Sequence, residues 1–174
     1  MPERTDPLVR AEHVLELCQG AASDLVRGAE SLGLKPEPHR LGAEARHLFV
    51  FVALSALIER GEKPVVDALK EQYALSLLDT RKQVKGIVDQ TMAGHEARRL
   101  KGLLDDAASK DPFAPYYGTW ESLKKSPDAG PFARFTDLVL DRCFQPGERK
   151  LARERVHTLA LSYADAVLDQ IYSP

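Results

Sequence analysis

Apolar residues recur at three- and four-residue steps along most of the chain, and this periodicity constrains the fold more than any other feature. The stripe is clearest near the start, at Val14, Cys18, Ala21, Leu25, Ala29 and Leu32. Side chains at these steps lie on one face of an α-helix, so each such stretch predicts an amphipathic helix. The two-residue alternation that half-buried strands require is absent from the sequence. We therefore predict an all-α fold.

Capping and helix-breaking residues predict where the helices begin and end. Thr5 or Asp6 caps the first helix, Pro7 suits its first turn, and Gly33 ends it. Further helices are expected near residues 41–60, 64–78, 80–92, 100–107, 132–143 and 148–172, with a short one near 119–125. Asp79 or Thr80 is expected to cap the helix that starts near residue 80. A break at Gly94 separates two of them, and one long helix over 80–109 is the alternative. A chain of 174 residues suits one domain. Without the short helix, we predict that residues 1–174 form a single-domain bundle of six to seven helices.

Composition and charge favour a soluble, cytoplasmic protein. The longest apolar run, Leu48 to Ile58, is shorter than the roughly 20 residues that span a bilayer, so it predicts a core helix. The first seven residues lack the apolar stretch of a secretory signal. The two cysteines, Cys18 and Cys143, lie far apart and lie on apolar stripes, as buried reduced thiols do. A formal net charge of −2 gives no global attraction to nucleic acid or to an anionic membrane.

Two Glu-x-x-His spacings are the sharpest candidates for chemistry. Glu44 precedes His47 on one predicted helix, and Glu154 precedes His157 on the last. Residues three apart share a helix face, so a carboxylate and an imidazole can bind one metal ion. The chain order resembles that of ferritin-like di-metal carboxylate proteins, and this resemblance implies a di-iron or di-manganese site. The alternative, which we favour, makes His47 a hydrogen-bonded core residue and Glu154 a surface charge, with no cofactor.

A segment rich in proline and aromatic residues, about 110–131, connects two of the predicted helices. Its prolines forbid a long helix, yet Phe113, Tyr116, Tyr117 and Trp120 crowd into eight positions. Aromatic rings bury large apolar surfaces, so this segment must pack on something. It either crosses the bundle as a pinned loop, covers a small-molecule pocket, or contacts a partner.

Three classes of function follow from these patterns. The first, which we favour, is a non-enzymatic interaction or regulatory module that self-associates or binds a protein partner. The second is a helical domain that binds a small molecule, and the third is a di-metal carboxylate protein. No motif for a catalytic serine, a phosphate-binding loop or a helix-turn-helix is present, so nucleotide chemistry and DNA reading are disfavoured.

Overall fold

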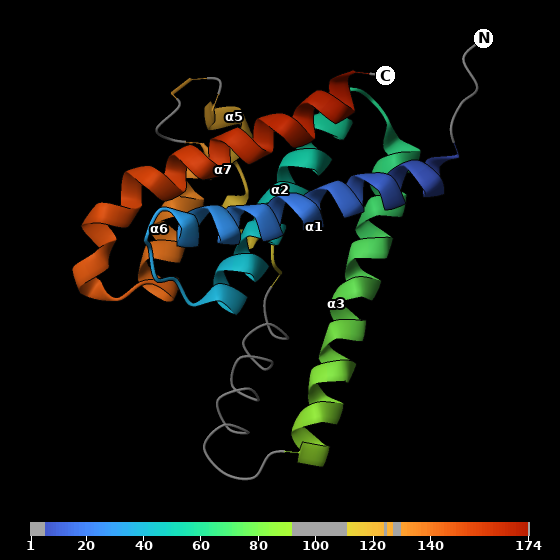
Figure 1. Ribbon diagram of the computed structural model, residues 1–174. Coiled ribbons are helices and arrows are strands. Elements are labelled where there is room, and N and C mark those ends of the chain that lie inside the picture. The colour runs from blue at the N-terminus through green and yellow to red at the C-terminus, as the bar shows by residue number, and fades with distance from the viewer. Residues whose placement is uncertain (1–5, 92–110, 124, 127–129, 174) are drawn as a thin grey trace.

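The computed structural model describes residues 6–91, 111–123, 125–126 and 130–173. Within these ranges the chain forms helices and turns without any strand, which confirms the predicted all-α fold. The α-helices are α1 (Pro7–Ser31), α2 (Pro38–Glu59), α3 (Lys63–Thr91), α5 (Thr119–Leu123), α6 (Pro131–Cys143) and α7 (Arg149–Tyr172) (Figure 1). Two 3-10 turns, Ala114–Tyr116 and Pro146–Glu148, precede α5 and α7. The predicted break at Gly94 and the predicted helix near 100–107 lie outside the described residues.

The ends of α1 follow the local signals in the sequence. The Asp6 side chain caps the helix by accepting a hydrogen bond of 2.9 Å from the backbone N–H of Leu8, and Pro7 occupies the first turn. At the other end Gly33 has a φ of +80°, a left-handed conformation that glycine adopts without strain. The chain can therefore turn sharply after α1 and enter α2.

α2 is the central helix of the bundle. It contacts α1, α3, α6 and α7, and it begins at Pro38, three residues earlier than predicted. Ten of its residues are buried, and they cover most of the helix surface: Leu41, Ala45, Leu48, Phe49, Val50, Val52, Ala53, Leu54, Ala56 and Leu57. By length and composition α2 could cross a membrane, but 61% of its most apolar window is buried inside the protein. Its position in the core accounts for its apolar composition.

α3 differs from the prediction, because it runs without interruption from Lys63 to Thr91. The expected end near Leu78, followed by a cap at Asp79 or Thr80, was wrong. These two residues are only modestly unfavourable inside a helix, and no proline or glycine stands between Val65 and Lys85. Nothing in that stretch forces the backbone to leave the helix. The far end of α3 extends beyond the other labelled helices (Figure 1).

Candidate functional site

α1 and α7 lie side by side and run in opposite directions (Figure 1). Near the start of α1, a guanidinium nitrogen of Arg10 donates to the backbone carbonyl of Ile171, close to the end of α7, at 3.4 Å. Toward the other end of α1, a Cβ atom added to Gly28 would lie 3.1 Å from a methyl carbon of Leu159. Glycine at position 28 thus allows the two helices to approach closely there.

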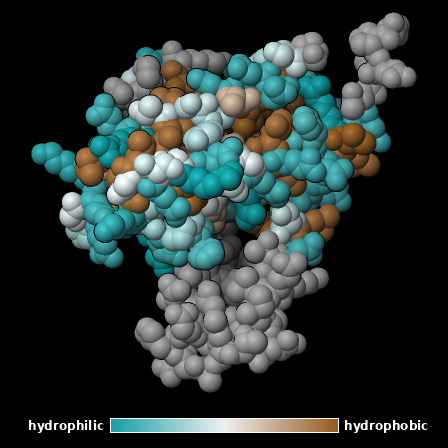
Figure 2. Space-filling view, viewed as in Figure 1, coloured by the Kyte–Doolittle hydropathy of each residue, from teal (hydrophilic) through white to brown (hydrophobic). Residues whose placement is uncertain are grey.

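Between these two points of contact lies an open groove of about 320 Å³, here called the α1–α7 groove. It is lined by His13, Glu16, Leu17, Gly20, Ala21, Asp24, Tyr163, Ala166 and Val167. Ala21 and Val167 are buried and form its floor, whereas His13 and Glu16 are exposed at its edge. Figure 2 shows apolar surface along the seam between the two helices, with hydrophilic side chains around it. The groove therefore has an apolar floor and an ionisable edge.

Two carboxylates, and no lysine or arginine, are among the residues that line the α1–α7 groove. Residues 11–26 of α1 and 156–172 of α7 contain no lysine or arginine, and they carry Glu12, Glu16, Asp24, Asp165 and Asp169. At the edge of the groove itself, Asp24 forms an ion pair with Arg27, the nearest arginine along α1. The side chains of Arg27 and Asp24 are 74% and 46% exposed, so this ion pair contributes little energy. The lining of the groove thus carries two carboxylates, of which Asp24 has a cationic neighbour and Glu16 lies among residues other than lysine and arginine.

Gly20 sits in the middle of this groove without a reason in the packing of the chain. Glycine costs roughly 1 kcal/mol relative to alanine inside a helix. At Gly28 the close approach of α7 explains the residue, but a Cβ atom on Gly20 would meet nothing within 4 Å. The open space above Gly20 is the middle of the groove. Within the described chain, nothing occupies the room that this glycine provides.

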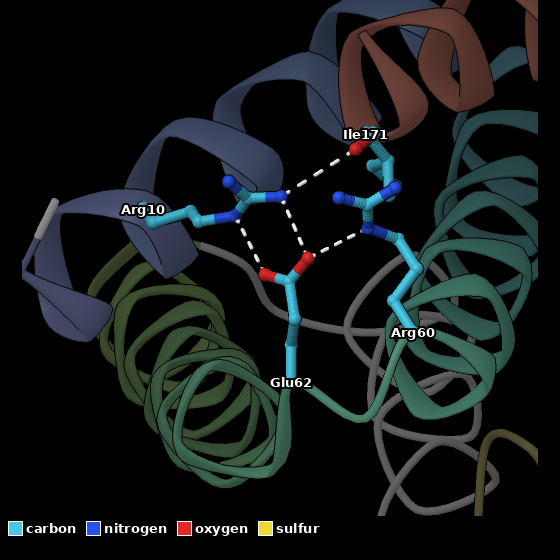
Figure 3. Close-up of polar contacts among 4 residues, drawn as sticks. All are labelled: Arg10, Arg60, Glu62 and Ile171. Atoms are coloured by element: carbon cyan, nitrogen blue, oxygen red, sulfur yellow. Dashed lines mark hydrogen bonds and ion pairs between the residues drawn. The ribbon is translucent and has the colours of Figure 1, made fainter. Parts of the chain in front are cut away.

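A network of charged groups holds the helices at one end of the groove (Figure 3). Glu62, in the turn between α2 and α3, forms ion pairs of 3.0 Å with Arg10 and 2.7 Å with Arg60. Arg10 also reaches the Ile171 carbonyl, so the network joins α1, α7 and the α2–α3 turn. The guanidinium of Arg60 lies 5.7 Å from the ring centre of Tyr172. These contacts fix the spacing of α1 and α7 where the groove begins.

The first predicted metal pair, Glu44 and His47, lies on α2, and each residue has another partner. A carboxylate oxygen of Glu44 accepts a hydrogen bond of 2.8 Å from Arg142 of α6. The imidazole Nδ1 of His47 is hydrogen-bonded to the hydroxyl of Tyr73 on α3. Burial, and then the positive charge of Arg46, lower the pKa of His47 to about 4. His47 is thus a neutral, hydrogen-bonded residue of the interior at physiological pH.

The second predicted metal pair, Glu154 and His157, lines a different groove, between α6 and α7. This α6–α7 groove has a volume of about 300 Å³ and is lined by Ala133, Thr136, Asp137, Arg153, Glu154 and His157. His157 Nδ1 lies 3.4 Å from the Thr136 hydroxyl, and Arg153 donates to Asp137 at 2.7 Å. In the part of the chain that the structure describes, no three His, Cys, Asp or Glu residues are grouped as metal ligands would be. The di-metal site stays a prediction.

The aromatic segment divides into an inner and an outer half. Tyr116 is fully buried, and its ring centre lies 5.5 Å from that of Phe51 on α2. The ring of Phe113 lies 5.6 Å from that of Tyr73, so both inner residues anchor the segment to the bundle. Of the two outer residues, Tyr117 is 63% exposed and hydrogen-bonds to Asp111. Trp120 is partly buried against the core, and its indole nitrogen donates to Glu59 at 2.9 Å.

The two cysteines are buried, as their positions on apolar stripes indicate. Burial raises the pKa of the Cys18 thiol and of the Cys143 thiol to about 12 in each case. A thiol with so high a pKa is almost wholly protonated near neutral pH, and the thiolate is the form that attacks an electrophile. Neither side chain is therefore suited to nucleophilic catalysis.

Sequence reasoning missed the α1–α7 groove, although two of its signals are visible in the sequence. One is Gly20, inside a helix with no break, and the other is the lack of lysine and arginine over residues 11–26 and 156–172. What the sequence does not show is that these two segments lie side by side.

Comparisons of the chain with protein-family models, with curated proteins and with solved structures find no significant match.

Proposed function

We propose that the chain is a non-enzymatic helical module that binds a protein partner in the α1–α7 groove. The observation that carries the proposal is the open space above Gly20, at the middle of a groove with an apolar floor and a charged edge. Protein-binding surfaces combine an apolar centre with a polar rim in this way. A glycine inside a helix lowers the stability of the free chain. Room for a bound partner gives a reason for glycine at position 20.

The length of the groove suits a helical partner. Its residues on α1 extend from His13 to Asp24, which at 1.5 Å per residue is about 16 Å, or three helical turns. Helix-in-groove recognition uses apolar side chains at steps of three, four and seven residues, and three turns accommodate such a set. A helix that enters a groove between two antiparallel helices forms a three-helix arrangement with them.

Site-specific photo-crosslinking in cells tests this proposal. A benzophenone amino acid replaces His13 at the edge of the groove, and in a matched control it replaces Glu30, which is exposed on α1 outside the groove. We expect a discrete protein adduct from position 13 alone, and its loss when Gly20→Leu fills the groove. The proposal is wrong if position 13 gives no adduct, or if both positions give the same ones.

A second candidate function is the binding of a polar small molecule in the α6–α7 groove. The observation that favours it is the gathering of hydroxyl, carboxylate, guanidinium and imidazole groups, on Thr136, Asp137, Arg153 and His157, around one depression. Its volume of about 300 Å³ is at the lower end of the range of ligand pockets. A ligand that binds only the native state raises the melting temperature. A metabolite library that leaves the melting temperature unchanged counts against this function.

Metal analysis of protein purified without chelator tests the di-metal alternative. Less than one equivalent of iron, manganese or zinc counts against it.

A further inference from the structure

We infer that the occupant of the α1–α7 groove is a basic amphipathic helix of another protein, with small aliphatic residues on its apolar face and lysine or arginine beside them. This inference rests on the proposed function and specifies the partner. Two observations carry it: the acidic residues among those that line the groove, and the space above Gly20.

The charge of the groove selects for a cationic partner. Glu16 and Asp24 line the groove, and no lysine or arginine is among the lining residues; Asp24 also forms an ion pair with Arg27. Complementary charge steers a partner toward a surface and disfavours partners of like charge. An acidic helix in this groove would place carboxylates against carboxylates, whereas lysine or arginine at its flanks would meet Glu16 and Asp24.

The shape of the groove limits the partner's apolar face to compact side chains. Its volume is about 320 Å³, and Gly20, Ala21 and Ala166 project little into it. A helix can lie close over these three residues when its own contact positions are alanine, valine or leucine. Large aromatic side chains along the whole contact face would hold the helices apart.

Selection from a peptide library tests the inference. The probe is a phage-displayed library of amphipathic helices of about five turns. Apolar positions hold alanine, valine or leucine, and the flanking positions hold lysine, glutamate or glutamine in equal proportion. The full-length chain is the bait, and Gly20→Leu is used to remove peptides that bind elsewhere. We expect lysine to be enriched at the flanking positions. The best peptide should bind at least about tenfold more weakly to the Glu16→Lys, Asp24→Lys double variant.

Two control variants carry the same changes outside the groove. Ser23→Leu adds a leucine to an exposed position of α1, and Glu30→Lys reverses a charge there. Both should bind the selected peptide as the unchanged chain does. Circular dichroism shows whether each variant keeps its helices.

The possible results separate this inference from the proposed function. Enriched peptides that require an open Gly20 but carry glutamate or glutamine overturn the basic partner and leave the groove as a binding site. If no peptide depends on an open Gly20, both proposals fail for helical partners. A chain that forms dimers by itself, which Gly20→Leu dissociates, shows that a second copy occupies the groove and overturns the basic partner.

Discussion

Replacing Gly20 by alanine should stabilise the free chain, and the same change at Gly28 should not. Both residues lie inside α1, so alanine offers the same gain of about 1 kcal/mol in helix propensity at each position. At Gly20 the added methyl group meets nothing within 4 Å, and the full gain is expected. At Gly28 it would lie 3.1 Å from a methyl carbon of Leu159 and 3.3 Å from the hydroxyl oxygen of Tyr163. That crowding offsets the gain or reverses it, because packed interiors tolerate extra volume poorly.

Urea denaturation followed by circular dichroism measures this difference. With a denaturant slope of about 2 kcal/mol per molar, a gain of 1 kcal/mol raises the midpoint by about 0.5 M. The melting temperature should rise by about 2–4 °C for a domain of this size. The Gly28→Ala variant should fall below the Gly20→Ala variant by at least about 1 kcal/mol.

Two results would refute the reasoning. If Gly20→Ala does not raise stability, then the space above Gly20 is not open in the free chain, and the groove loses its main support. If Gly28→Ala stabilises as much as Gly20→Ala, then α1 and α7 do not approach each other as closely as the contacts at Leu159 require.

Four further predictions concern the interior and the charged network. Burial, with the nearby Arg46, lowers the pKa of His47 to about 4, from 6.5 in an unfolded chain, so the unfolded state is protonated first as the pH falls. Stability due to this residue is complete above pH 6.5 and decreases toward pH 4; about 2 kcal/mol should be lost by pH 5. Between pH 7 and pH 5, the free energy of unfolding in urea should fall less for His47→Gln than for the unchanged chain. An equal fall in both chains contradicts the assignment of the low pKa to His47. Tyr116→Phe removes a buried hydroxyl that has no hydrogen-bond partner among the described residues, so thermal unfolding should show equal or slightly higher stability. Tyr73→Phe removes the partner of His47 and should lower stability by about 1 kcal/mol. Glu62→Gln weakens two ion pairs of a carboxylate that is only 21% exposed, and a loss of about 1–2 kcal/mol is expected in urea; unchanged stability would show that the network contributes little.

The fold could be predicted where local chemistry decides it. Asp6, Pro7 and Gly33 act within one or two turns of their own positions, and the ends of α1 lie close to where these residues place them. The false boundary at Asp79 shows the limit of the same approach. Asp and Thr favour the start of a helix, but they do not prevent one from continuing.

The candidate groove could not be predicted, because it depends on how distant segments align. Gly28 meets Leu159 only once α1 and α7 lie antiparallel, and no periodic pattern gives that alignment. The same reason explains the predicted metal ligands. Glu44 is on the expected helix, but its partner, Arg142, is 98 residues away in the sequence. Residue spacing along one helix cannot show which side chain of another helix will face it.

The contacts of Glu62 affect how a partner would bind in the α1–α7 groove. One carboxylate holds Arg10 of α1 and Arg60 at the end of α2, and Arg10 also donates to the last turn of α7, so this network ties the ends of three helices together. The α1–α7 groove therefore has its shape before a partner binds. The entropy lost through ordering then falls mainly on the incoming segment, so affinity should depend on how readily that segment is helical by itself.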